Sequence, residues 1–192
     1  MEVFVLKVIK DIRESEKMKF SKKWIWPLLL LIWPYVLNLV NYIENENIQT
    51  IILYLYFFFT IVVYVGNIIN AFRYKKDNDM YELAFINMIL KIVHIPFYLS
   101  IFLIGLVFLF ASVVPALVFI TPMILFYLFM IDILLMITTS MYGVNVIKKA
   151  VQSHVVTKKK AIIHLILHFI FVTDVISSIY LFIIVRKYNK KY

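Results

Sequence analysis

Long apolar runs separated by short polar connectors dominate the chain. A helix that crosses a bilayer needs about 20 apolar residues, because each residue adds a rise of only 1.5 Å. The pattern predicts five such helices, over residues 24–42, 48–72, 83–113 with a bend near residue 96, 116–142 and 161–185. The predicted fold is therefore all-α, a polytopic membrane helical bundle of about five transmembrane helices in one integral membrane domain, residues 24–185.

The two ends of the chain show a different pattern. Residues 1–23 place Val5, Val8 and Ile12 on one helical face and Lys7 and Asp11 on the opposite face. This predicts an N-terminal amphipathic interfacial helix whose basic side chains contact anionic lipid headgroups, although a solvated or partner-binding helix fits the same spacing. Residues 186–192 form a basic tail.

Composition supports a membrane protein and excludes several other classes. Of the 192 residues, 64% are hydrophobic, whereas soluble domains have about 45–50%. The chain has no cysteine, which excludes disulfides and cysteine-based metal sites. Its three glycines, Gly66, Gly105 and Gly143, are too far apart for a phosphate-binding loop, and Gly143 is placed to end the predicted helix 116–142. The frequent Ile, Phe, Tyr, Asn and Lys indicate an AT-rich, bacterial genome, and the run DILLMITTSMYG resembles segments of small multi-pass bacterial membrane proteins.

The formal charge of +9 resides mainly in the segments outside the apolar runs. These segments carry 7 basic residues in 1–23, 3 in 73–79, 5 in 144–160 and 4 after residue 185. Because basic connectors stay on the cytoplasmic side, we expect a multi-pass protein of the cell membrane with a cytoplasmic N-terminus. Five spans leave the basic tail on the outer face, which conflicts with that rule. The lipid bilayer is the expected partner of this charge, and nucleic acid is not.

Ionisable side chains inside the predicted spans form the candidate site. On a continuous helix 161–185, the residues His164, His168 and Asp174 share about one third of the circumference. Lys91 and His94 belong to a polar stripe on the third span, and Asp132 lies near the middle of the fourth. Such residues are costly at membrane depth and normally face protein or water. We therefore expect the third, fourth and fifth spans to pack with this polar seam inside. The seam comprises Lys91, His94, Asp132, His164, His168 and Asp174.

Four interpretations of the seam remain open from the residues. It can be structural, with polar groups pairing across helices. It can be a relay for protons or ions. His164 and His168, four residues apart, could bind one metal ion with Asp174, although no glutamate stands between them as in zinc-protease helices. Lys91 could also bind the anionic part of a small molecule or lipid headgroup.

No catalytic or nucleotide-binding motif appears in the sequence. The leading expectation is a non-enzymatic membrane component, an accessory subunit that binds a membrane protein partner and needs no cofactor. The alternative is a small transporter or an ion- or proton-coupled permease that uses the seam. A metal-dependent membrane enzyme with a His/Asp site is the third.

Overall fold

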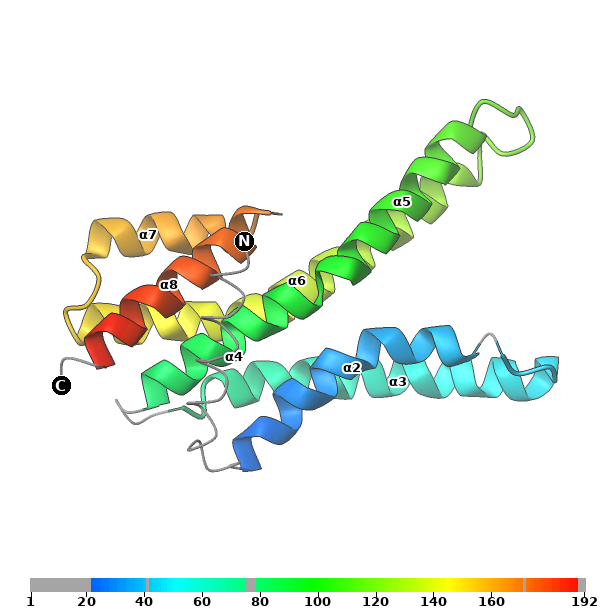
Figure 1. Ribbon diagram of the computed structural model, residues 1–192. Coiled ribbons are helices and arrows are strands. Elements are labelled where there is room, and N and C mark those ends of the chain that lie inside the picture. The colour runs from blue at the N-terminus through cyan, green and yellow to red at the C-terminus, as the bar shows by residue number, and fades with distance from the viewer. Residues whose placement is uncertain (1–21, 41, 75–78, 171, 190–192) are drawn as a thin grey trace, which may run out of the picture.

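The computed structural model describes residues 22–40, 42–74, 79–170 and 172–189 (Figure 1). Within these ranges the protein is all-helical, with 84% helix and no strand. The helices are α2 (Ile25–Val40), α3 (Glu46–Ala71), α4 (Asp79–Val93), α5 (Ile95–Ala111), α6 (Thr121–Gln152), α7 (Lys158–Leu167) and α8 (Thr173–Asn189), and a 3-10 turn, Lys22–Trp24, precedes α2. The predicted surface helix lies outside the described residues except for its last two positions, and α8 includes the first residues of the predicted tail.

Two long helical hairpins, α2–α3 and α5–α6, extend to one side of the molecule (Figure 1). Three helical stretches in the described residues are long and apolar enough to cross a membrane, and a shorter apolar helix accompanies them. The long stretches are Glu46–Ala71, Met80–Ala111 and Thr121–Gln152, and the shorter one is Ile25–Leu37. These features confirm the predicted class, a helical membrane bundle.

The third apolar run is divided into two helices close to the position of the predicted bend. α4 and α5 follow one another with only His94 between them, and Pro96 stands in the first turn of α5. Proline is tolerated there because the first N–H groups of a helix have no partner within it. The two helices therefore follow one another without a loop and form one apolar stretch, Met80–Ala111.

The prediction that Gly143 ends the fourth helix is wrong. α6 runs on to Gln152 and includes the first part of the connector expected at 144–160. Its 32 residues rise about 48 Å, well beyond the roughly 30 Å of a hydrocarbon core. The additional turns are buried against other helices, which stabilises them without a membrane.

The run 161–185 is divided into two helices and does not form the continuous helix that we expected. α7 ends at Leu167 with His168 as its C-cap, and Val172 adopts a left-handed φ of 67°. α8 starts at Thr173, which places Asp174 in its first turn. A carboxylate is favourable there because the first turn of a helix carries partial positive charge. α7 and α8 thus form a short helical hairpin beside the end of α6 (Figure 1).

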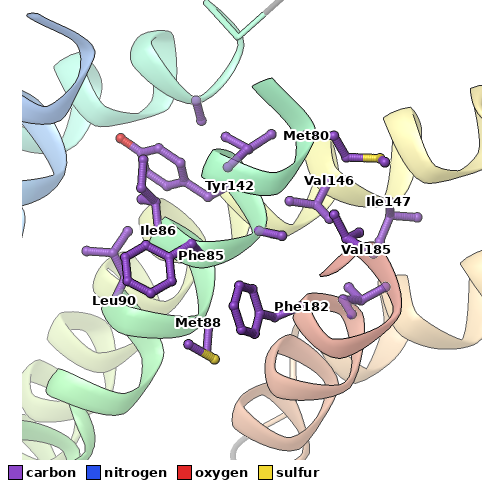
Figure 2. Close-up of a cluster of buried hydrophobic side chains, with 14 of the residues drawn as sticks. Met80, Phe85, Ile86, Met88, Leu90, Tyr142, Val146, Ile147, Phe182 and Val185 are labelled. Atoms are coloured by element: carbon purple, nitrogen blue, oxygen red, sulfur yellow. The ribbon is translucent and has the colours of Figure 1, made fainter. Parts of the chain in front are cut away.

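The buried core lies where α4 passes between α6 and α8. Figure 2 shows apolar side chains from these three helices meeting around Phe85 and Phe182, whose rings lie 5.8 Å apart between centroids. Leu90, Tyr142 and Val185 are fully buried in the same cluster. The outer parts of the two long hairpins, in contrast, expose large apolar side chains.

A polar contact attaches the α2–α3 hairpin to this core. The hydroxyl of Tyr142 on α6 donates to Asn67 Oδ1 at 2.8 Å and accepts from Asn70 Nδ2 at 3.1 Å. Asn145 Nδ2, one turn further along α6, donates to the carbonyl oxygen of Ala71 at 2.6 Å. The side chains of Tyr142, Asn67, Asn70 and Asn145 are all buried, so these bonds fix the register of α3 against α6.

Candidate functional site

A buried ion pair joins α4 to α8 at the centre of the core. The ammonium of Lys91 contacts Asp174 Oδ2, and the exposed fractions of the two side chains are 1% and 6%. The other carboxylate oxygen, Oδ1, lies 2.8 Å from Nδ1 of His168 at the end of α7. Three residues predicted for the seam, Lys91, His168 and Asp174, are thus brought together by three helices.

Two hydroxyl groups of α6 complete the surroundings of the ammonium. Lys91 Nζ donates to Thr139 Oγ1 at 2.7 Å and to Ser140 Oγ at 2.8 Å. Ser140 in turn donates to the carbonyl oxygen of His168 at 2.7 Å, and Thr139 bonds back to carbonyls of its own helix. With Asp174, these partners use all three N–H donors of the ammonium. We call Lys91, Thr139, Ser140, His168 and Asp174 the buried cluster.

Gly143 makes room for the histidine of the buried cluster. The imidazole of His168 lies against α6 at Gly143, where an added Cβ atom would overlap the ring. The glycine that resembled a helix stop therefore has a packing role in the middle of α6. Nε2 of His168 is buried without a hydrogen-bond partner, so the ring is held through Nδ1 and this contact.

His94, the next predicted residue, is buried but does not join the cluster. Its ring nitrogens lie 2.5 Å from the carbonyl oxygen of Leu90 and 3.2 Å from that of Leu30 on α2. Tyr35, also on α2, donates to the carbonyl oxygen of Val93 at 2.6 Å. These bonds attach α2 to the joint between α4 and α5, which is a structural contact.

Asp132 stands apart from the buried cluster. It lies in the N-terminal half of α6, its exposed fraction is 9%, and its Oδ1 has no hydrogen-bond partner. Asn87, one turn before Lys91 on α4, is fully buried and both of its side-chain polar atoms are likewise without partners. Asp132 and Asn87, like His168 at Nε2, therefore have bonding capacity that the described residues do not use.

His164 faces a different set of groups from His168. Its Nδ1 lies 2.8 Å from Ser177 Oγ on α8, and its ring stacks on Tyr180 at 5.2 Å between centroids. α7, which carries His164, is too short to cross a bilayer. Burial lowers the pKa of the His164 imidazole, and the nearby His168 and Lys160 lower it further. The two histidines do not converge, and the described residues contain no group of three His, Cys, Asp or Glu that could hold a metal ion. The geometry does not support the metal site suggested for His164, His168 and Asp174.

Thr139 and Ser140 are the two cluster residues that the predicted seam does not include. Thr139 bonds back to carbonyls of its own helix, whereas Ser140 donates to the carbonyl oxygen of His168. The available signal was the pair itself, because two neighbouring hydroxyls can flank an ammonium from one helix.

With the geometry of the site described, the chain can be compared with known proteins. A family model matches residues 16–190, which is most of the chain and includes the whole buried cluster. The chain belongs to the Family of unknown function (DUF6652). No curated protein and no solved structure matches this DUF6652 protein.

The buried cluster generates a stability prediction. Lys91→Met or Asp174→Asn leaves one charge buried without its partner, which costs about 3–5 kcal/mol. The double variant carries neither charge, so we expect its loss to be much smaller than the sum of the two single losses. The measurement is thermal unfolding in detergent, followed by intrinsic fluorescence.

Lys187→Met is the matched control, because Lys187 is exposed on α8 and loses the same charge. It should unfold at the wild-type temperature. Strictly additive effects of Lys91→Met and Asp174→Asn would contradict a direct pair between them.

Proposed function

We propose that this DUF6652 protein is a non-enzymatic component of the membrane, an accessory subunit that acts by binding another membrane protein. The observation that supports this most is the closure of the buried cluster. The donors of Lys91 and both carboxylate oxygens of Asp174 are engaged inside the protein. A transport or catalytic site needs groups that exchange partners with a ligand, whereas these groups hold α4, α6 and α8 together.

The surface left for a partner is helical and apolar. Phe58 on α3, Phe102 and Phe110 on α5 and Phe126 on α6 are each more than 60% exposed. Lipid tails are as apolar as such side chains, so a partner helix would be selected by shape and by a few polar groups.

In this proposal the two long hairpins cross the bilayer, and α7–α8 remains on the basic side. The α2–α3 and α5–α6 connectors lie at one end of the molecule, and the start of α7 and the end of α8 lie toward the other (Figure 1). Glu44 and Glu46 belong to the first end, whereas Lys160, Arg186 and Lys187 belong to the second. This arrangement supports a cytoplasmic position for the basic C-terminal end and removes the conflict of a five-span topology.

The topology is testable because the chain has no cysteine of its own. Single cysteines in place of exposed Glu44, Thr157 and Asn189 can be labelled with a membrane-impermeant maleimide on intact cells. We expect Glu44→Cys to react on intact cells, and Thr157→Cys and Asn189→Cys only after permeabilisation. The unsubstituted chain is the background control. Reaction of Asn189→Cys together with Glu44→Cys would instead support five crossings.

The accessory role predicts a specific neighbour in the membrane. Azidophenylalanine in place of Phe110, which is 73% exposed, should cross-link one protein of defined size in living cells. The same residue in place of Phe85, which is 6% exposed, is the matched control and should give no product with another protein. Purification in mild detergent should recover the cross-linked protein in a stoichiometric complex. A protein that purifies alone and cross-links only lipid from Phe110 would contradict the proposal.

A second function, a small ion- or proton-coupled permease, is supported by Asp132. A carboxyl group inside a candidate span, with one oxygen unpaired, is the type of residue that carries protons or ions. This function predicts that vesicles containing the purified protein collapse an imposed pH or sodium gradient, and that Asp132→Asn abolishes the flux without lowering the unfolding temperature. Flux no faster than in empty vesicles would exclude it for these ions.

A further inference from the structure

A groove of about 380 Å³ runs along the cytoplasmic half of α3, beside the first turn of α2. Trp26 forms one wall, Gly66 part of the floor, and Arg73 the end next to the α3–α4 connector. The remaining lining consists of aliphatic side chains of α3, namely Ile61, Val62, Val65 and Ile69. One end of the groove is therefore cationic and the rest is apolar.

The wall of the groove is fixed by close packing. The indole of Trp26 lies directly on the backbone of α3 at Gly66, where an added Cβ atom would overlap the ring. The indole is therefore anchored beside the groove. Tryptophan is also the residue that favours the boundary between headgroups and acyl chains, which places the Arg73 end at headgroup level.

The length of the groove corresponds to one leaflet. Ten residues separate Ile61 from Ala71, where α3 ends, which is a rise of about 15 Å, and Arg73 follows two residues later. Half of a hydrocarbon core is about 15 Å. With the exposed guanidinium of Arg73 at the headgroups, the aliphatic side chains extend to the depth reached by an acyl chain. The groove is too small for a partner helix, whose diameter is about 10–12 Å with side chains.

We infer that this groove is a binding site for one anionic phospholipid of the cytoplasmic leaflet. The acyl chain lies along the aliphatic face of α3 against Trp26, and the phosphate is bound by Arg73. A guanidinium offers two parallel N–H donors to phosphate oxygens, so the charge and the geometry both select an acidic headgroup. This inference uses the topology proposed above and does not depend on the accessory function.

Trp26 reports occupancy of the groove directly. Vesicles of equal parts phosphatidylcholine and phosphatidylglycerol are prepared in two forms, in which only one of the two lipids carries bromine on its acyl chains. Bromine quenches indole fluorescence on contact, and subtraction of the Trp26→Phe signal isolates Trp26 from the other tryptophans, Trp24 and Trp33. We expect Trp26 to favour phosphatidylglycerol about fivefold, the ratio that one basic residue near the membrane surface gives.

Arg73→Gln should reduce this preference to about one. Lys187→Gln is the matched control, because it removes the same charge from an exposed residue outside the groove, and it should retain the preference. Arg73→Lys should retain part of it. A second measurement, which does not use Trp26, compares how much phosphatidylglycerol stays bound to the wild type and to Arg73→Gln in native mass spectra. Equal quenching by both lipids in the wild type, or a preference that survives Arg73→Gln, would overturn the inference.

Discussion

The burial of Lys91 determines how α4, α6, α7 and α8 pack together. An ammonium removed from water requires an opposite charge and a partner for each N–H, and Lys91 obtains them from two other helices. Asp174 must therefore approach α4, and α8 begins at that point. His168 must end α7 close enough to bond the same carboxylate. The break in the last apolar run, the position of α8 and the glycine in α6 all follow from this requirement.

The rest of the molecule is organised around that cluster without taking part in it. α6 belongs to both parts, since its N-terminal half pairs with α5 and its C-terminal half packs on α4, α7 and α8. Tyr142 in the C-terminal half of α6 bonds to Asn67 and Asn70 of the α2–α3 hairpin. The polar bonds are thus concentrated at the basic end, and the apolar hairpins project from it. The hairpins thus expose apolar side chains, while the buried charges of Lys91 and Asp174 pair within the protein.

Hydrophobic periodicity was sufficient to predict the class of fold and its long apolar helices. The ionisable residues within the apolar runs predicted a seam of six side chains, of which Lys91, His168 and Asp174 meet and His94, Asp132 and His164 do not. Periodicity could not predict the division of 161–185, which contains no glycine or proline and is broken by contacts with helices distant in sequence. The role of Gly143 was missed for the same reason, since only the folded structure places the ring of His168 over it.

The unbroken length of α6 has a mechanical consequence. A rod of about 48 Å that lies partly among the apolar hairpins and partly in the core acts as a lever. A change in tilt of about 10°, small beside the range that bilayer thickness imposes on membrane helices, displaces one end by roughly 8 Å relative to the other. The C-terminal end of α6 packs on α7 and α8, so it cannot move by this distance without moving relative to them. Under the proposed topology, a change in membrane thickness that tilts α6 would therefore move the C-terminal hairpin as well.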